Sequence, residues 1–513
     1  MKFMQTHKIY LTPISPIHIG CGEDFEPTNY VIDNEVLFNF DPANLALNNR
    51  QKTELLNRVN RLDLLSIQRF FLENKEKVLS STYYFADVAE GLANDYKNKV
   101  GKVAQRESDG NKVINNLSIE RTAFLPVKHL PYIPASGFKG ALATALLDQA
   151  HQAKNNPRVN KNDHGKLFKE YIGEFAESKL RFVKFADFSP LVQAESKIYY
   201  ALNFKKKVGK IGGEGRAMAL RRECIKSGQY RAFLSELALM QGDANKMQIA
   251  DYFTLLKNFY LPIFKQEAEL LAERNLVNRH YLKQLEQLFN LPNVALIRLG
   301  KNGADSKTYQ ADGIAQIKIM GAKGTPLNFK DSSTTVWLAG TNQQQQNDLL
   351  PFGWAIIEAD PTAENEPLKQ WCDAQPKSKF NRSVILAKRE EQKAKQAQLK
   401  AEEEAKQQAK LAEEKAKAEM LNSLSDNQRL IMDFVEKLKN TSERQADNTG
   451  SPLLKEAEAL INQAIEWENA ERQFACEQIT VELLKSGIRI TGLKQGYKRP
   501  ASISRTSVDM SAP

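Results

Sequence analysis

The sequence predicts an α+β fold of two modules in which strands alternate with helices, followed by a charged helical spacer and a small helical domain. Three observations support this prediction. Strand-like apolar runs alternate with helix-like apolar stripes over about the first 380 residues. The composition then changes to almost only Ala, Glu, Gln, Lys and Leu, and apolar periodicity returns after residue 420. The length of 513 residues and the apolar content of 42% allow about three domains with a sizeable core.

The first module is assigned to residues 1–195. Alternating apolar residues within 5–40 predict two or three strands. Leu55, Leu56 and Val59 begin an apolar stripe at helical spacing, which predicts helix over 51–105. The remaining predicted elements are a polar loop or hairpin over 105–122, a helix over 141–150 and an alternating strand over 181–188.

The second module is assigned to residues 196–380 and begins with a strand over 197–204. It contains a predicted helical insertion over about 243–290. Tyr252, Phe259 and Tyr260 belong to an apolar face at helical spacing, and we expect this face to pack on the core. Strand–helix–strand order, seen twice, fits two ferredoxin-like (RRM-type) modules with helical insertions.

The C-terminal region divides into three parts. Residues 381–420 carry Glu–Lys pairs at i,i+4 spacing and few apolar residues, which predicts a charged, solvated helical spacer rather than a coiled coil. Residues 421–486 regain apolar periodicity and predict a small helical domain. Residues 487–513 predict a flexible basic tail, which either contacts nucleic acid or is simply solvated.

Bulk properties restrict the class of protein. The formal net charge of +10 and the pI of about 9.1 fit a polyanionic partner, although an ordinary solvated protein can carry the same charge. The four cysteines lie far apart, so we expect neither a zinc site nor a disulfide framework. The sequence has no signal-peptide pattern and no apolar window of membrane-spanning length, so we expect a cytoplasmic location and no membrane partner.

The most informative motif runs from Leu130 to Leu142. Pro134 ends an apolar strand, and the small residues Ser136, Gly137 and Gly140 let a backbone approach closely. Lys139 adds a cation at the start of a helix. This pattern predicts a phosphate-contacting loop, and the alternative is an ordinary strand-to-helix turn. The motif does not fit Walker A, because the required Gly-Lys-Ser/Thr ending is missing.

Two further segments combine glycine with nearby cations. Gly20 and Gly22 form a Gly-x-Gly turn after His18, and a later glycine-rich loop contains Gly300. Asp187 ends a predicted strand, where capping a turn is favoured over metal binding. Cations occur in both the late loop and an intervening polar stretch, and they include Lys205, Lys206, Lys207, Arg221, Arg222, Arg298, Lys301 and Lys307.

Five motifs in this order resemble the RAMP superfamily of CRISPR proteins over roughly residues 5–360. The segment at 16–22 resembles the family's Pro-x-His-Ile-Gly-x-Gly strand-turn, and the segment at 133–140 resembles its Ile-Pro-Gly-Ser-Ser-x-Lys-Gly loop. The match departs from the family at Ala135-Ser136-Gly137 and at Ala143, where the family often has Arg. The other three motifs are Arg222-Glu223-Cys224-Ile225, Ile297-Arg298-Leu299-Gly300 and Pro351-Phe352-Gly353-Trp354.

The resemblance is strongest to the fifth-subunit family of the type III-A (Csm) effector, which caps the 3′ end of the crRNA. It implies a non-enzymatic crRNA-binding backbone or capping subunit without metal or cofactor. Its partners would be crRNA and other RAMP subunits, with target RNA and a recruited nuclease as further candidates. The RNA-binding residues expected from it are Gly20, Gly22, Ser136, Gly137, Lys139, Gly140, Arg222, Arg298, Gly300 and Lys307.

Two alternatives remain open from the sequence. The first is a metal-independent RAMP endoribonuclease that processes precursor crRNA with His18 as general acid. A packed, structural His18 is the competing interpretation, because the residue lies in an apolar strand. The second alternative is a scaffold whose C-terminal helical domain recruits another protein.

Overall fold

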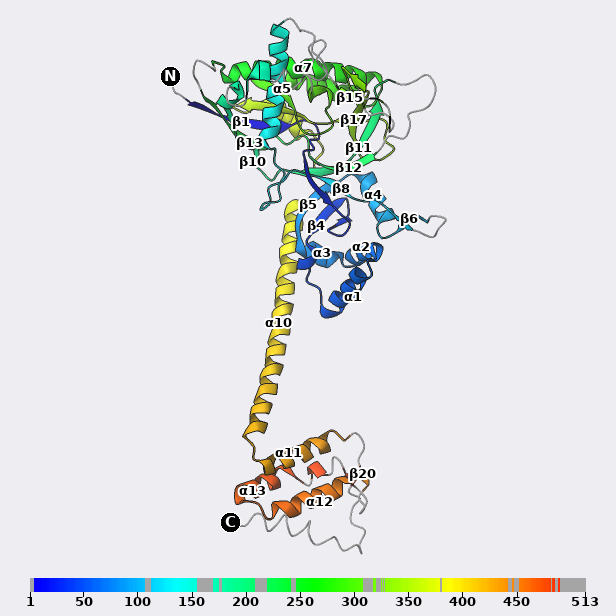
Figure 1. Cartoon of the computed structure of the whole chain (residues 1–513), viewed down its shortest axis with the longest axis vertical. Coiled ribbons are helices and arrows are strands. Elements are labelled where there is room, and N and C mark those ends of the chain that lie inside the picture. Colours follow the sequence, from blue (N-terminus) through cyan, green and yellow to red (C-terminus); the bar gives the residue numbers. More distant parts are fainter. Residues whose placement is uncertain are drawn as a thin grey trace. The chain divides into compact units, whose positions relative to one another are not determined.

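The computed structural model divides the chain into two compact units, Met1–Lys395 and Gln396–Pro513, and Figure 1 labels their elements. Each unit is described by itself. The structure describes residues 4–106, 112–154, 169–174, 178–207, 219–240, 246–307, 317–319, 324, 326, 328–378, 381–441, 445–446, 452–480, 482–484 and 488–489.

The first unit contains a six-stranded sheet in the order β10-β13-β1-β19-β14, with β9 also paired to β13. Its strand pairs are antiparallel. Strands from both predicted modules share this sheet, so the boundary at residues 195 and 196 does not separate two sheets. The strands are β1 Met4–Pro13, β9 Val183–Phe185, β10 Ser189–Pro190, β13 Phe233–Met240, β14 Val294–Arg298 and β19 Trp354–Ala359.

The second sheet of this unit has nine strands in the order β2-β8-β12-β11-β5-β4-β3, with β17 paired to β11 and to β18. The pairs β5–β11 and β8–β12 are parallel. The end of β2 meets β5, because the Phe25 and Tyr84 rings stack with centroids 6.0 Å apart. The strands are β2 Gly20–Phe25, β3 Tyr30–Asp33, β4 Val36–Phe40, β5 Thr82–Val88, β8 Ile119–Thr122, β11 Ser196–Lys205, β12 Ala219–Ile225, β17 Thr335–Gly340 and β18 Leu350–Pro351.

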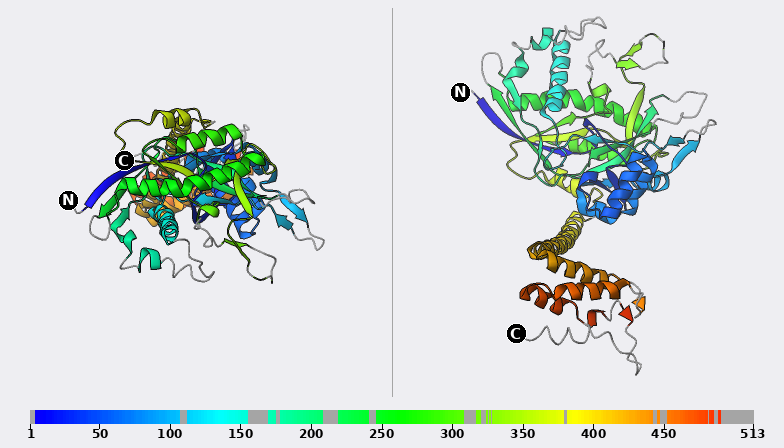
Figure 2. Two further views of the ribbon diagram at one scale, coloured as in Figure 1. Left: turned by 90° about the horizontal axis from the view of Figure 1, so that it is seen from above. Right: turned by 60° about the horizontal axis from the view of Figure 1, so that its bottom comes forward.

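Long helices pack against the six-stranded sheet (Figure 2). They are α5 Ala135–Ala153, α7 Ile249–Glu273 and α8 Arg279–Phe289. Helices α7 and α8 occupy the predicted insertion at 243–290. Tyr252, Phe259 and Tyr260 are buried among the core residues, which confirms that the aromatic face of the insertion is core.

The segment predicted as helix over 51–105 contains a strand as well. Helices α1 Asn49–Asn60, α2 Leu64–Glu73, α3 Lys75–Ser81 and α4 Glu90–Lys99 flank the strand β5. The β5 residues 84–88 are buried in succession and therefore lack the alternation that marks a half-exposed strand. The hairpin predicted within 105–122 is confirmed by β6 Val103–Arg106 and β7 Lys112–Ile114, whereas its predicted tip lies outside the described residues.

The shorter elements of the first unit connect these layers. The single-turn helices are η1 Pro42–Asn44, η2 Lys179–Phe182 and η3 Asp305–Lys307. The others are β15 Ile317–Ile319, β16 Asn328–Lys330 and α9 Glu366–Asp373.

Helix α10 Arg382–Ser423 begins in the first unit. Ile385 and Leu386 pack against a cluster of buried Phe and Val side chains, and Arg389 Nη1 donates to the Thr82 carbonyl at 3.1 Å. The predicted spacer is therefore helical, but its first residues pack on the first unit. From residue 397 to residue 420 its side chains are exposed, and a Lys400–Glu404 pair lies on that surface.

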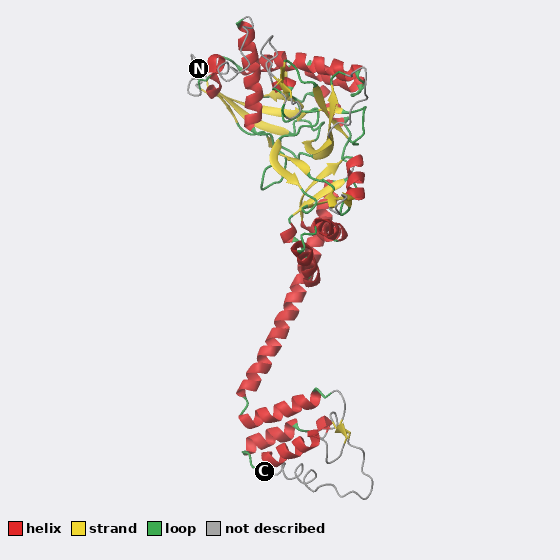
Figure 3. Ribbon diagram, turned by 45° about the vertical axis from the view of Figure 1, so that its right-hand side comes forward, coloured by secondary structure: helices red, strands yellow, loops and turns green. Residues whose placement is uncertain are grey.

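The second unit is mainly helical in its described part (Figure 3). Its core includes Ile431, Phe434, Leu453 and Leu460, which confirms a hydrophobic core within residues 421–486. The predicted basic tail, 487–513, lies outside the described residues except for two. The elements are α11 Asp426–Lys439, α12 Pro452–Ala464, α13 Asn469–Gln478, β20 Gln445–Ala446 and β21 Ile488–Arg489. A search of the described helices finds none with the length and apolar character to span a membrane.

Candidate nucleic-acid interface

Four sequence motifs that are distant in the chain meet in the first unit. The Lys301 amide donates to the His18 carbonyl, and the Gly353 amide donates to the Pro16 carbonyl, each at 2.8 Å. Ile17 and Ile225 exchange two backbone hydrogen bonds. The motifs at residues 16–22, 222–225, 297–300 and 351–354 therefore form one continuous piece of structure.

His18 is a packed residue at the centre of this meeting point. Its side chain is fully buried, its Nδ1 donates to the Glu223 carbonyl at 2.7 Å, and its Nε2 lies 3.4 Å from Glu120 Oε2. The His18 ring, Arg222 and Lys301 hold the pKa of the Glu120 carboxyl well below its usual range. These contacts are those of a packed histidine, the structural interpretation that the sequence left open.

Arg222 and Arg298 do not have the exposure expected of phosphate contacts. Arg222 is 6% exposed and bonds both oxygens of Glu120, with two contacts of 3.1 Å. Arg298 is 4% exposed, with Nη1 2.7 Å from Glu267 Oε2 and Nε donating to the Phe352 carbonyl at 2.9 Å. A carboxylate therefore already neutralises each guanidinium within the protein.

Glu223 supplies buried acceptors to the same piece of structure. Its carboxylate accepts from the Thr122 amide at 3.0 Å, from Ser196 Oγ at 2.9 Å and from the Tyr84 hydroxyl. Burial raises the pKa of Glu223. The sequence indicates no role for Glu223 or Glu120, because a single acidic residue in a strand gives no sign of its distant partners.

Five glycines are expected to bind RNA, and the fold itself explains why three of these positions need glycine. A Cβ at Gly300 would lie 2.2 Å from the His18 carbonyl oxygen, and Gly300 has a φ of +80°. A Cβ at Gly20 would lie 2.8 Å from Lys301 Cε, so Gly20 leaves space for the Lys301 side chain. Gly22 has a φ of +84°, which side-chain-bearing residues rarely adopt.

The other two glycines lie in helix α5, which begins directly after Pro134. The prediction of a loop over residues 135–140 is therefore wrong, because these residues form the first two turns of the helix. Asp187 Oδ1 accepts from the Ala135 amide at 2.7 Å, which confirms that Asp187 has a capping role. A Cβ at Gly137 or Gly140 would meet nothing within 4 Å, and neither residue has a positive φ.

These two glycines therefore lower helix stability without a packing reason in the described part of the chain. Glycine in a helix costs about 1 kcal/mol relative to alanine. Ser136, Gly137 and Gly140 are exposed, and Lys139 is half-exposed. We call Ser136, Gly137, Lys139, Gly140 and Lys184 the α5 surface. Burial and the Lys184 charge lower the pKa of Lys139. The neighbouring Phe138 and Phe185 rings pack with centroids 4.8 Å apart, so exposed Lys184 belongs to the same region of the surface.

The α5 surface is connected to the Gly20 turn by backbone hydrogen bonds. The Ala123 amide donates to the Ile19 carbonyl at 2.6 Å, and the Tyr132 amide donates to the Ala123 carbonyl at 3.1 Å. Exposed Lys301 and Lys307 lie in the adjoining 298–307 loop. Desolvation, together with the charges of Arg298 and Lys301, lowers the pKa of Lys307. The stretch 208–218, whose glycines and cations belong to the intervening polar stretch, lies outside the described residues.

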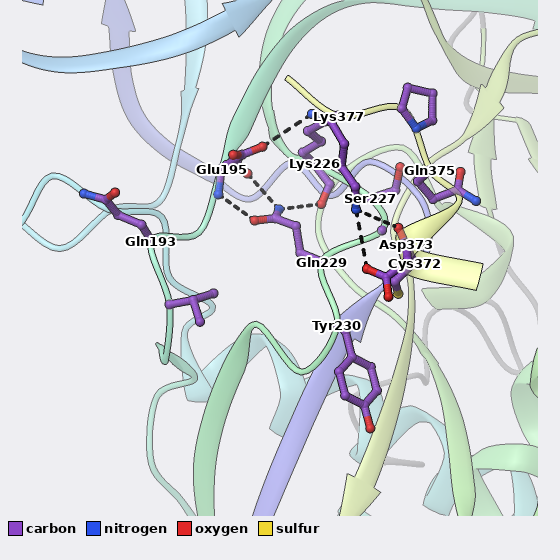
Figure 4. A pocket seen from close by; sticks show the side chains of 13 residues that line it. Gln193, Glu195, Lys226, Ser227, Gln229, Tyr230, Cys372, Asp373, Gln375 and Lys377 are labelled. Carbon is purple, nitrogen blue, oxygen red and sulfur yellow. Dashed lines mark hydrogen bonds and ion pairs between the residues drawn. The ribbon is translucent and has the colours of Figure 1, made fainter. Parts of the chain in front are cut away.

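A surface cavity of about 280 Å³ lies elsewhere in the first unit (Figure 4). Its polar side chains mainly bond to one another: Gln229 joins Glu195 and Lys226, and Lys226 Nζ lies 3.4 Å from Glu195 Oε2. This self-pairing gives the cavity no evident ligand chemistry. Among the described residues, no three His, Cys, Asp or Glu side chains are grouped to hold a metal ion.

Comparisons with known proteins give one matching family and several similar solved structures. A family model described as the RAMP superfamily matches residues 10–304, more than half of the chain. One similar solved chain belongs to the cryo-EM structure of a Csm–crRNA–target RNA ternary complex of a type III-A CRISPR-Cas system, with TM-score 0.45, 16% identity and coverage of 69% of this chain and 100% of that chain. Another is the crystal structure of T. onnurineus Csm5, with TM-score 0.42, 15% identity and the same coverage. Among curated proteins the comparison finds no match.

Proposed function

Because the chain belongs to the RAMP superfamily, we propose that it is a crRNA-binding subunit of a type III CRISPR effector. In this proposal it is a Csm-type subunit that caps the 3′ end of the guide. Its partners are crRNA and neighbouring RAMP subunits, with target RNA bound along the guide. The observation that carries the proposal is the α5 surface, where glycines without an internal packing role lie beside two cations.

The chemistry of this surface suits an RNA backbone. Glycine exposes the main chain, so phosphate and sugar groups can approach the helix closely. Lys139 and Lys184 supply charge to phosphates without reading the base sequence. A protein that holds guides of different sequence needs this kind of contact. Lys307 extends the same chemistry along the adjoining loop, whereas Lys301 Nζ is paired with Glu120 Oε2 at 3.0 Å.

The buried position of His18 weighs against the endoribonuclease alternative. General acid catalysis requires a side chain within hydrogen-bond reach of the leaving oxygen. His18 is fully buried, and its Nδ1 is engaged by the Glu223 carbonyl. The proposed function is therefore binding of RNA, in which His18 stabilises the protein fold.

A salt titration of RNA binding tests the proposal. If the full-length chain neutralises about three to five phosphates of single-stranded RNA, the logarithm of its binding constant should fall with log salt at a slope of roughly −2 to −3.5. Fluorescence anisotropy with two unrelated RNA sequences should give similar affinities. A slope near zero, or binding restricted to one sequence, would contradict backbone recognition.

A further inference from the structure

Arg121, on β8, is a buried cation with unused hydrogen-bond donors. Its side chain is 7% exposed, and its Cζ lies 4.8 Å from the ring centre of Phe25, 5.4 Å from that of Tyr84 and 3.4 Å from that of Phe124. Its Nη1 lies 3.5 Å from Glu23 Oε2. Within the described part of the chain, Nε and Nη2 are buried without a hydrogen-bond partner. The guanidinium therefore lies beneath the Phe124 ring and holds that ring in place by a cation–π contact.

A row of aromatic rings leads from Arg121 to the surface. The Phe124 ring covers the guanidinium and lies 6.1 Å from the His129 ring at an interplanar angle of 18°. His129 in turn lies 4.5 Å from Tyr83, which is 38% exposed. The Nδ1 atom of His129 is also buried without a partner among the described residues. We call Tyr83, Phe124 and His129 the ring platform.

The loop that carries two of these rings is closed at its base. The Leu125 amide donates to the Leu130 carbonyl at 2.9 Å, and His129 adopts a φ of +52°. Lys128 and Val127 are exposed at the loop tip. The loop therefore holds a cation beside an aromatic surface, the combination that binds single-stranded nucleic acid by phosphate pairing and base stacking.

We propose that the ring platform is a stacking site for one nucleobase of single-stranded RNA, with Lys128 contacting an adjoining phosphate. This inference rests on the proposed function and adds a base contact to it. Bases that are not paired in a duplex stack on aromatic side chains in this way.

The ring platform is also connected to the α5 surface through the backbone, so one RNA strand could contact both. Phe124 directly follows Ala123, whose backbone links the Gly20 turn to Tyr132, and α5 begins three residues after Tyr132. Burial and the Arg121 charge lower the pKa of His129, which favours the neutral form of its ring. A neutral ring offers its face to a base without adding a second cation to a site that already contains Arg121.

The test compares Tyr83→Leu with Tyr83→Phe in the full-length protein. Tyr83→Leu removes the exposed ring and should weaken binding of a labelled single-stranded RNA about tenfold, whereas Tyr83→Phe keeps the ring and should bind within about twofold of the original protein. A series of RNAs with one abasic nucleotide each should contain a position that weakens the original protein by a similar factor. That position should have no further effect in Tyr83→Leu. Circular dichroism melting checks that both variants fold.

A second variant keeps the test decisive if Tyr83→Leu does not fold. Lys128→Ala, at the exposed loop tip, should make the salt slope less steep by about 0.7. Equal RNA affinities of the original protein, Tyr83→Leu and Lys128→Ala would overturn the inference while leaving the proposed function intact. Unchanged RNA affinity with loss of co-purifying effector subunits would assign the platform to a protein partner and also overturn it. Absence of salt-dependent RNA binding in the original protein would contradict both proposals.

Discussion

Replacing Arg298 by Met should lower the free energy of unfolding by about 3–5 kcal/mol, because it leaves a buried carboxylate without its cation. Arg298 Nη1 lies 2.7 Å from Glu267 Oε2, and the side chains are 3% and 11% exposed. Methionine fills a similar volume, so the loss should come mainly from the unpaired charge. Urea unfolding of the full-length protein, compared with that of the original protein, measures the difference.

Two variants serve as controls for this result. Adding Glu267→Gln to Arg298→Met removes the unpaired charge and keeps an acceptor for Trp354 Nε1, so it should restore a large part of the stability. Lys307→Ala changes an exposed cation of the adjoining loop and should alter stability by less than about 0.5 kcal/mol while weakening RNA binding. A stable Arg298→Met variant with weakened RNA binding would show that Arg298 contacts RNA after all.

Replacing Gly300 by Ala should lower the free energy of unfolding by about 2–4 kcal/mol. The new Cβ would lie 2.2 Å from the His18 carbonyl oxygen, which belongs to the backbone and cannot move away as a flexible side chain would. The φ of +80° adds strain for any residue with a side chain. Thermal and urea unfolding measure the loss.

Gly140→Ala is the matched control, because the same substitution is made at a position where the new methyl group has open space around it. Its Cβ would meet nothing within 4 Å, and alanine favours the helix, so stability should stay equal or rise by up to about 1 kcal/mol. RNA affinity should nevertheless fall, because the added methyl group limits the approach of the RNA backbone. A stabilised Gly140→Ala variant with unchanged RNA affinity would remove the reason for assigning this glycine to RNA.

The sequence predicts the fold best where the apolar spacing within a single helix or strand is enough to identify that element. The helices of the insertion and the buried aromatic face at Tyr252 and Tyr260 follow from helical spacing. Strand β5 was missed, because its residues from Tyr84 to Val88 are buried in succession and show no alternation. The sheets combine strands from both sequence halves, and strand pairing over such distances cannot be read from local periodicity.

The candidate site was predicted less well, for a related reason. Residue type and neighbouring glycines point to Arg298 as a phosphate contact, yet Arg298 bonds Glu267, which lies 31 residues earlier in the chain. Lys184 follows no glycine and belongs to no motif, although its charge lowers the pKa of Lys139. Residue type gives the chemistry that is available at a position. Only the packing shows whether another side chain of the same protein already uses that chemistry.

The salt dependence of RNA binding by Lys139→Ala tests the central assignment of the α5 surface most directly. Lys139 is half-exposed next to Lys184, and its substitution should leave the fold unchanged. Titrations at several salt concentrations should show weaker binding for all RNA sequences and a slope less steep by about 0.7, the value for one lost phosphate contact on single strands. An unchanged slope and affinity would contradict the account and leave the α5 surface with a structural role only.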